Sequence, residues 1–251
     1  MHIGFMGTGE IAACMVRALT GRGHMIRVSE RNTRVAAELA RLPDVAIASN
    51  EEVTAQSDTV VLCLMADVAD EVMPTLPFRA DQQVISVMAD MPLTRVAPLC
   101  APATNISLTI PLPFIDQGGC PLPVYPDTGS VAALFGGENI IVPCSSQDGF
   151  NAHMAACALS SVVLAEIQHT ADWLAGLTGN AAGAEAYVAA LIAGYFQGMR
   201  FDGSGEVQSA LDSISTEGGF NATLREHMAP ARTELTRGLD AFRPRLGLPD
   251  A

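Results

Sequence analysis

Lysine is the residue that the sequence lacks altogether, since all fourteen basic side chains among the 251 residues are arginines. Without a side-chain amine the chain cannot form a Schiff base with a carbonyl substrate, and no lysine can serve as a general acid or base. The absence excludes these chemistries and favours none of the others by itself.

Positive charge is scarce, and so are long apolar runs. The formal net charge is -13 at pH 7, which repels a phosphate backbone and argues against a nucleic-acid partner. The longest apolar run, residues 181–196, is interrupted by Glu185 and falls short of the roughly 18 to 20 residues of a membrane helix. The first predicted strand begins directly after Met1, which leaves no room for a signal peptide. We therefore expect a cytoplasmic protein with no membrane partner.

The six cysteines are widely spaced, lie mostly in apolar stretches, and form no Cys-x-x-Cys pair. Such spacing is typical of buried free thiols rather than of disulfides or a metal site. We expect no metal cofactor.

The first residues carry the most informative motif. An apolar strand at residues 3–6 runs into Gly7-Thr8-Gly9-Glu10-Ile11-Ala12, a Gly-x-Gly-x-x-Ala pattern that opens a helix. In this motif the first glycine permits the tight turn, the second lets backbone amides approach a pyrophosphate, and the small third residue packs the helix on the strand. The helix N-terminus would hold the pyrophosphate. The pattern predicts a dinucleotide-binding fold, with an ordinary glycine-rich turn as the alternative.

The end of the second predicted strand bears on the choice between NAD and NADP. An acid there accepts a hydrogen bond from the ribose 2′-hydroxyl, whereas an arginine one or two positions later binds a 2′-phosphate. Glu30 and Arg31 are adjacent, so the two signals conflict. With Ser29, Asn32 and Arg34 nearby the segment favours NADP, and NAD selected by Glu30 stays open. The predicted cofactor-binding residues are Gly7, Thr8, Gly9, Glu10, Ile11, Ser29, Arg31, Asn32, Asn50, Leu64, Met65 and Ala89.

Strands and helices alternate along the first two thirds of the chain. We expect strands at residues 2–6, 25–28, 45–48, 59–64, 84–88, 105–110 and 140–142, helices at 10–19 and 33–42, and a short helix capped by Asn50. The runs at 59–64, 84–88 and 105–110 are typical of parallel strands buried on both faces. The predicted fold class is α/β, an N-terminal Rossmann doubly wound sheet followed by an all-α dimerisation domain.

The character of the sequence changes near residue 164, after which no further strand pattern occurs. We predict a Rossmann domain at 1–164 and a helical dimerisation and substrate domain at 165–251. Residues 181–199 are apolar on nearly every face and predict a helix surrounded by protein. Because about ninety residues cannot easily enclose it, we expect a homodimer in which the partner chain covers this helix. Burial within its own subunit is the alternative.

These segments resemble the pyrroline-5-carboxylate reductases, and more broadly the two-domain reductases with an N-terminal Rossmann fold and a C-terminal helical dimerisation domain. The resemblance spans nearly the whole chain. Residues 3–9 are similar to the family's opening, and residues 28–32 to its segment for the ribose and 2′-phosphate. Asn50-Glu51-Glu52 and residues 58–62 resemble the approach to its fourth strand, and residues 215–224 stand where the family has Ser-Pro-Gly-Gly-Thr-Thr, which holds the substrate carboxylate.

Several motifs of that family are altered in this chain. Leu64-Met65-Ala66 replaces the usual Val-Lys-Pro, and residues 110–114 read Ile-Pro-Leu-Pro-Phe in place of Met-Pro-Asn-Thr-Pro. The Leu-Ser-Gly-Ser-Gly-Pro-Ala-Tyr signature is present only as Leu177-Thr178-Gly179 and, after an insertion, Ala186-Tyr187. The family's proton-donating threonine aligns with Ala175. The resemblance therefore predicts the fold better than it predicts the substrate.

Hydride transfer to an imine asks little of the protein, because a protonated imine is already activated and needs one hydrogen-bond donor near its nitrogen. Thr178 occupies a family position and is a candidate catalytic donor, as is His169, which shares a helix face with Asp172. The alternative is that these are surface, capping or solvated residues. We expect the site in the cleft between the domains, lined also by Met65, Ala89 and Pro111.

The resemblance implies that the substrate carboxylate is bound by residues near the C-terminus, although the two glycines among them could form only the turn that begins a helix. The predicted substrate-binding residues are Glu217, Gly218, Gly219 and Asn221.

Three functions follow from this reading. The first is the NAD(P)H-dependent reduction of a cyclic imine, pyrroline-5-carboxylate or a relative, by an oxidoreductase acting on CH–NH bonds, with an imine or imino acid as the small-molecule partner. The second is another oxidoreductase on the same architecture, an F420-linked NADP oxidoreductase or a β-hydroxyacid dehydrogenase, although the dehydrogenases rely on a lysine that this chain lacks. The third is a non-catalytic nucleotide-binding paralogue, which the altered motifs favour.

Overall fold

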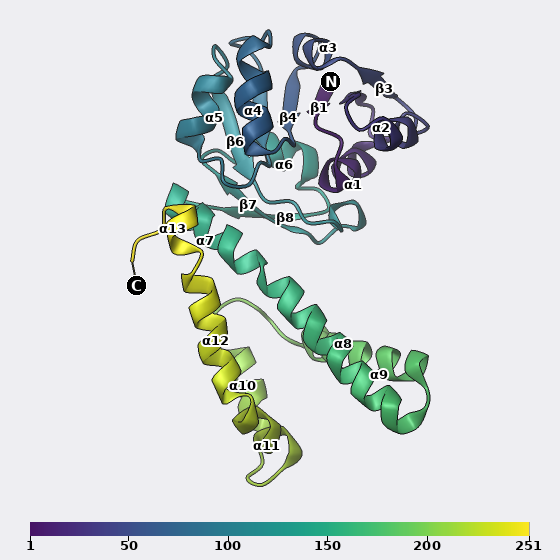
Figure 1. Cartoon of the computed structure of the whole chain (residues 1–251), viewed down its shortest axis with the longest axis vertical. Helices are drawn as coiled ribbons and strands as arrows, with labels where there is room; N and C mark the ends of the chain where they lie inside the picture. The colour runs from purple at the N-terminus through teal and green to yellow at the C-terminus, as the bar shows by residue number, and fades with distance from the viewer. Residues whose placement is uncertain (251) are drawn as a thin grey trace. The chain divides into compact units, whose positions relative to one another are not determined.

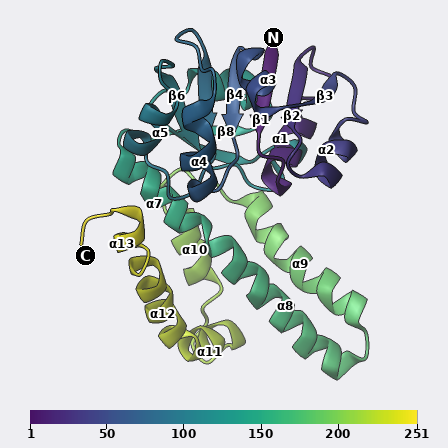
Figure 2. The ribbon, with the colours of Figure 1, turned by 45° about the horizontal axis from the view of Figure 1, so that its top comes forward.

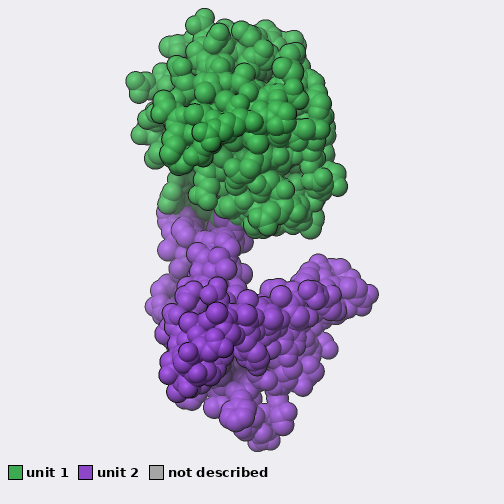
Figure 3. All heavy atoms as spheres, turned by 90° about the vertical axis from the view of Figure 1, so that its right-hand side faces the viewer, with its two compact units in different colours: residues 1–154, 245–248 green, residues 155–244, 249–251 purple. Residues whose placement is uncertain are grey.

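The computed structural model describes residues 1–250, and the chain divides into two compact units, coloured green and purple in Figure 3. The first unit comprises Met1–Met154 and Arg245–Leu248, and the second is formed mainly by Ala155–Pro244. The division after Met154 lies earlier than the boundary at residue 164 that the sequence suggested. The apolar residues before that predicted boundary belong to the start of a long helix of the second unit.

The first unit is built on one eight-stranded sheet with the strand order β3-β2-β1-β4-β5-β6-β7-β8 (Figure 1). Neighbouring strands from β3 to β6 are parallel, β7 is antiparallel to β6, and β8 is parallel to β7. The order of the first six strands is that of a doubly wound dinucleotide fold, which confirms the predicted fold class. The strands are β1 (His2–Met6), β2 (Met25–Ser29), β3 (Val45–Ala48), β4 (Thr59–Leu62), β5 (Gln83–Ser86), β6 (Asn105–Thr109), β7 (Pro121–Tyr125) and β8 (Ile140–Pro143).

Helices connect these strands. They are α1 (Glu10–Leu19), α2 (Thr33–Leu39), α3 (Asn50–Ala55), α4 (Ala66–Val72), α5 (Leu93–Leu99) and α6 (Gly129–Phe135), with 3₁₀ turns η1 (Met73–Thr75) and η2 (Ile115–Gln117). Helix α7 (Gln147–Cys157) follows β8 and leads into the second unit. The short helix α13 (Arg243–Leu246) near the C-terminus contributes residues to the same unit.

The core lies where the central strands meet the helices. Ile3 and Phe5 of β1, Val61 of β4 and Ile85 of β5 are fully buried and belong to one hydrophobic cluster with the apolar face of α1. Strands covered on both faces need a continuous apolar sequence, and this is the pattern from which β4 and β5 were predicted.

Two local predictions were wrong. No strand was predicted at β7, because Pro121 and Pro123 interrupt its pattern and proline is uncommon inside sheets. The antiparallel pairing of β7 with β6 uses Val124 and Tyr125 instead. The cap of α3 is Ser49, not Asn50: the Ser49 hydroxyl accepts from the amide of Glu52 at 3.2 Å, and the Glu52 carboxylate accepts from the Ser49 amide at 3.0 Å. This reciprocal capping box places Asn50 in the first turn of the helix.

The second unit is all helical, as predicted. Its helices α8 (Leu159–Thr178) and α9 (Ala181–Gly198) form a hairpin and lie side by side in Figures 1 and 2. The hairpin turns at Gly179, whose φ of +68° ends α8 in a left-handed cap, and at Asn180, whose side chain accepts from the amide of Gly183 at 3.0 Å. The remaining helices are α10 (Glu206–Ser213), α11 (Phe220–His227) and α12 (Ala229–Asp240).

The helices of this unit leave many large apolar side chains exposed. On α9 only Ala184 and Val188 are buried, so the single chain does not enclose the helix that the sequence predicts to be surrounded by protein. The exposed large apolar residues of the hairpin are Leu159, Val162, Val163, Leu164, Trp173, Leu177, Tyr187, Leu191, Tyr195 and Phe196.

By length and composition alone, one helical stretch, residues 147–178, is long and apolar enough to cross a membrane. The sequence patterns did not predict this stretch.

Candidate functional site

The turn between β1 and α1 has the geometry that its glycines predict. Gly7 has a φ of +92°, and a Cβ atom there would collide with the backbone carbonyl of Cys63. Gly9 has an ordinary φ of -82°, and a Cβ atom there would meet nothing within 4 Å. Gly7 is therefore required by the fold, whereas Gly9 faces open space next to the start of the helix.

The N-terminus of α1 is free to hold an anion. Gly9 is its N-cap and supplies no side-chain hydrogen bond to the helix. The first amides of a helix have no partner inside it, and the helix dipole makes this end attractive to negative charge. The predicted residues Glu10 and Ile11 contribute these first-turn amides.

Ser29, the last residue of β2, holds the β1–α1 turn in place through two hydrogen bonds. Its hydroxyl accepts a hydrogen bond from the amide of Gly7 at 2.8 Å, and its carbonyl accepts from the Thr8 hydroxyl at 3.3 Å. Ser29 and Thr8 are both buried. Their role in this structure is to connect the turn to the second strand.

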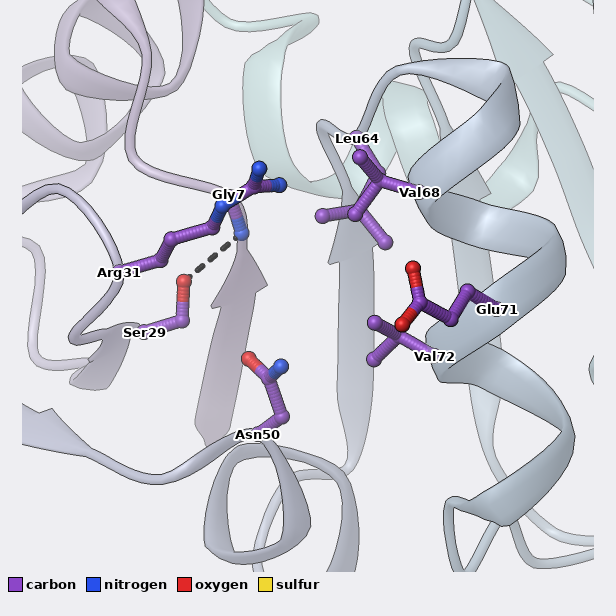
Figure 4. A pocket seen from close by; sticks show the side chains of 8 residues that line it. All are labelled: Gly7, Ser29, Arg31, Asn50, Leu64, Val68, Glu71 and Val72. Carbon is purple, nitrogen blue, oxygen red and sulfur yellow. Dashed lines mark hydrogen bonds between the residues drawn. The ribbon is translucent and has the colours of Figure 1, made fainter.

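A pocket of about 290 Å³ opens beside this turn (Figure 4). Five predicted cofactor residues line it together, although they come from four separate segments of the chain: Gly7, Ser29, Arg31, Asn50 and Leu64. The other lining residues, which the sequence analysis missed, are Val68, Glu71 and Val72 of α4. Their spacing of three and four residues places them on one helix face, which is the signal that could have identified them.

Ser29 is bonded to the turn, but the other three polar side chains of the pocket have no partner within the described residues. Among residues 1–250, no side chain or backbone group forms a hydrogen bond or ion pair with the guanidinium of Arg31, the carboxylate of Glu71 or the amide of Asn50. In Figure 4 Arg31 extends toward the turn from one side, while Glu71 projects from the facing helix. Opposite charges therefore border the pocket without neutralising each other.

Not every predicted cofactor residue borders this pocket. Asn32 caps α2, where its side chain accepts from the amide of Val35 at 3.3 Å. Met65 caps α4 and is 74% exposed. Ala89 follows β5 and lies directly before Asp90, whose carboxylate is bound by Arg245 at 3.0 and 3.1 Å.

The candidate catalytic residues lie on α8 of the second unit. His169 is exposed, and its ring has no hydrogen-bond partner in the part of the chain that the structure describes. The neighbouring carboxylate of Asp172 accepts from Gln168 at 2.9 Å. Thr178, in the last turn, donates its hydroxyl proton to the carbonyl of Leu174 at 3.0 Å. Nine residues separate His169 from Thr178, about 14 Å along a helix, so the two cannot serve the same atom.

The predicted substrate segment forms the turn before α11. Gly218 has a φ of +71°, and the amide of Gly219 donates to the carbonyl of Thr216 at 2.9 Å. Gly219 is the N-cap of α11, and Asn221 lies in its first turn. Glu217 is exposed beside them. The two glycines thus form the turn that begins α11, and the binding of a carboxylate there stays a prediction.

Comparison with known proteins bears on both units. Residues 2–90 match the protein family described as NADP oxidoreductase, coenzyme F420-dependent. None of the curated proteins matches the chain in sequence. Among solved structures, the 1-pyrroline-5-carboxylate reductase of Streptococcus pyogenes matches with a TM-score of 0.82 at 18% identity, over 96% of this chain and 97% of that one. The chain has the pyrroline-5-carboxylate reductase fold.

Two further structures have this fold. A pyrroline carboxylate reductase of Plasmodium falciparum, solved with NADP bound, has a TM-score of 0.82 at 16% identity and covers 98% of this chain and 97% of its own. An imine reductase from Pseudomonas sp. has a TM-score of 0.65 at 14% identity, over 96% of this chain and 90% of its own.

Proposed function

We propose that the chain is an NADP(H)-dependent reductase of C=N bonds, with a cyclic imine that carries a carboxylate, such as pyrroline-5-carboxylate, as its substrate. The observation that carries the proposal is the pocket beside the β1–α1 turn, with an unpaired arginine at its edge, in a chain that has the fold of these reductases. When bound, NADPH supplies the hydride.

The residues of the first unit fit this cofactor. The open space at Gly9 and the uncapped N-terminus of α1 suit a pyrophosphate. Arg31 has no acidic partner, so its guanidinium is available to a 2′-phosphate through charge-assisted hydrogen bonds. Glu30 is the feature that would favour NAD instead.

Replacement of Arg31 by alanine tests the preference for NADP. We expect Arg31→Ala to weaken NADPH binding roughly 10- to 100-fold and to leave NADH nearly unchanged. Arg34→Ala is the matched control, because Arg34 is paired with Glu38 at 2.8 Å and does not line the pocket. Equal losses for NADPH and NADH in titrations of Arg31→Ala would refute the assignment.

The substrate is assigned to residues of the second unit. The Thr178 hydroxyl has one proton, now donated to Leu174, and a rotation about its Cα–Cβ bond would offer that proton to an imine nitrogen. The amides at the start of α11, after Gly218 and Gly219, would bind a carboxylate. Because Thr178 and His169 lie too far apart to serve one atom, only the variant that removes the donor, Thr178→Val or His169→Ala, should lower turnover roughly 10- to 1,000-fold without changing the NADPH affinity. If both variants keep full activity, the donor is neither of them.

The decisive experiment is a screen of NADPH oxidation across cyclic imines, imino acids and β-keto acids. We expect turnover with cyclic imines that carry a carboxylate, and none in Gly9→Val, whose side chain fills the space assigned to the pyrophosphate. Turnover confined to β-keto acids would contradict the proposal. Binding of NADPH without turnover of any substrate would indicate a non-catalytic nucleotide-binding protein.

An F420-linked NADP oxidoreductase is the second candidate, because the family match of residues 2–90 favours it. This function needs reduced F420 as the electron donor and no imine. Reduction of NADP by reduced F420, followed in the same screen, separates the two candidates.

We further propose a homodimer formed through the helical unit. The α8–α9 hairpin leaves many large apolar side chains exposed, among them Trp173 at 65%, Leu177 at 70% and Tyr187 at 61%. Soluble monomers rarely expose large contiguous apolar surfaces. A second copy covers such a surface without needing a membrane. Light scattering in detergent-free buffer at micromolar concentration should give twice the chain mass of 26.3 kDa, and a monodisperse monomer would refute the proposal.

A further inference from the structure

The pocket beside the β1–α1 turn joins an apolar wall to two polar groups of opposite charge. Leu64, Val68 and Val72 are half-buried and contribute the wall, which carries no aromatic ring and no charge. Such a surface suits the face of a flat, weakly hydrated ring system. Arg31 borders the same pocket and can stack its guanidinium plane on a ring or bind a phosphate.

Asn50 and Glu71 are the lining residues that neither the apolar wall nor the phosphate site explains, and of the two Glu71 carries a charge. The preceding residue on the same helix, Asp70, is bound by Arg95 of α5 in an ion pair. The Glu71 carboxylate has no such partner in residues 1–250, and the nearby Arg31 forms no ion pair with it across the pocket. A carboxylate at the edge of an apolar slot gains most from a ligand that brings N–H donors to it.

An ionised carboxylate can only accept hydrogen bonds. It therefore favours a base whose facing edge carries an amino group and disfavours one whose edge carries a carbonyl oxygen at the same place. The adenine ring has an amino group at its 6-position, and the hypoxanthine ring has a carbonyl oxygen there. The two bases are otherwise nearly equal in size and in stacking surface.

We propose that Glu71 is a specificity-determining residue that reads the 6-amino group of the adenine ring of the dinucleotide, while Leu64, Val68 and Val72 contact the ring face. This inference rests on the proposed binding of NADP(H) and adds to it the residue that selects the base. Figure 4 shows Glu71 directed from α4 toward the space between the helix and the turn, where such a ring would lie.

The test compares the affinities of NADPH and of its hypoxanthine analogue, reduced nicotinamide hypoxanthine dinucleotide phosphate, by calorimetry without any substrate. We expect the wild-type protein to bind NADPH about 10-fold more tightly, the effect of one charge-assisted hydrogen bond at a partly exposed site. In Glu71→Gln the ratio should fall to about 1, because the amide can present its oxygen to the amino group or its nitrogen to the carbonyl.

Glu51→Gln is the matched control. Glu51 is an exposed acid on the neighbouring helix α3, it does not line the pocket, and its replacement changes the net charge by the same amount. We expect it to keep the wild-type ratio. Glu71 is itself exposed, so its replacement by glutamine should leave the melting temperature unchanged.

The outcomes separate the two proposals. If the wild-type protein binds both dinucleotides equally, or if Glu71→Gln retains the full preference for NADPH, the role of Glu71 is refuted while NADPH binding stands. If Glu51→Gln loses the preference to the same extent, general electrostatics and not a contact is responsible, which also refutes it. If neither dinucleotide binds at millimolar concentration, the proposed function itself fails.

Discussion

Replacement of Gly7 by alanine should lower the stability of the fold, whereas replacement of Gly9 by alanine should lower the affinity for NADPH. At Gly7 a side chain must adopt a φ of +92° and place its Cβ against the Cys63 carbonyl. That carbonyl cannot move aside easily, because the amide of Cys63 is bonded to the Met6 carbonyl at 2.8 Å. The left-handed backbone costs roughly 1 to 2 kcal/mol and the overpacking roughly 1 to 3 kcal/mol. Gly7→Ala should therefore lower the free energy of unfolding by about 2 to 5 kcal/mol.

At Gly9 the same change should leave the fold nearly intact. Its φ of -82° suits alanine, and no atom lies within 4 Å of the added methyl group. Alanine is a poorer N-cap than glycine, but it also restricts the unfolded chain, and the two effects offset each other to within about 1 kcal/mol. The methyl group enters the space assigned to the pyrophosphate, so we expect NADPH affinity to fall at least 10-fold.

Thermal unfolding followed by circular dichroism and NADPH titration measure the two effects. For a chain of this size each kcal/mol lowers the melting temperature by about 2 to 4 °C, so Gly7→Ala should melt roughly 4 to 20 °C below the wild type. Gly9→Ala should melt within about 4 °C of it. A Gly7→Ala protein as stable as the wild type, or a Gly9→Ala protein with normal NADPH affinity, would show that the roles are assigned wrongly.

Three further predictions concern the stability of the first unit. Gln82 is fully buried, and its side-chain amide forms hydrogen bonds with three backbone groups. Gln82→Leu should therefore lower the free energy of unfolding in urea by about 2 to 4 kcal/mol, and an unchanged urea midpoint would contradict this. Hydrogen bonds from the backbone amide and side chain of Ser49 lower the pKa of Glu52, so this carboxylate stabilises the fold above pH 4.5, and the contribution is lost as the pH falls below that value. Glu52→Gln should flatten this acid dependence in unfolding titrations. Burial raises the pKa of Cys100 from 9.0 to about 12, so stability should fall as the pH rises above 9.0, and less steeply in Cys100→Ala.

The sequence predicted those parts of the fold that depend on local pattern. Glycines predicted the turn after β1, and continuous apolar runs predicted the buried strands β4 and β5. The absence of any strand pattern predicted that the second unit is helical. Strand β7 lacked such a pattern because its pairing partner, and not its own proline-rich sequence, makes it a strand. A cap was predicted at Asn50 one residue too late, because asparagine and serine are both good N-caps and only the reciprocal bond of Glu52 decides between them.

The sequence predicted the site residues that belong to a recognisable motif, but not those that reach the site only through the packing of the fold. Gly7, Ser29 and Arg31 come from segments whose role is visible in sequence, and the structure brings them to one pocket. Glu71 and its helix neighbours become lining residues only once the sheet order places α4 across from the end of β2. His169 and Thr178 lie on the same helix, about 14 Å apart along its axis, too far to form one site. Their spacing in the sequence and the rise of a helix per residue already predict this distance.

The reaction of the six cysteine thiols can report the local opening of each unit. None of the six forms a disulfide, and burial raises the pKa of each thiol above its ordinary value, so the native protein presents almost no thiolate to an alkylating reagent at neutral pH. Cys157 belongs to the helical unit, and the other five belong to the sheet unit. Mass spectra of the chain after timed alkylation would therefore count openings unit by unit, and a dimer contact on the helices would register as a slower reaction of Cys157 alone.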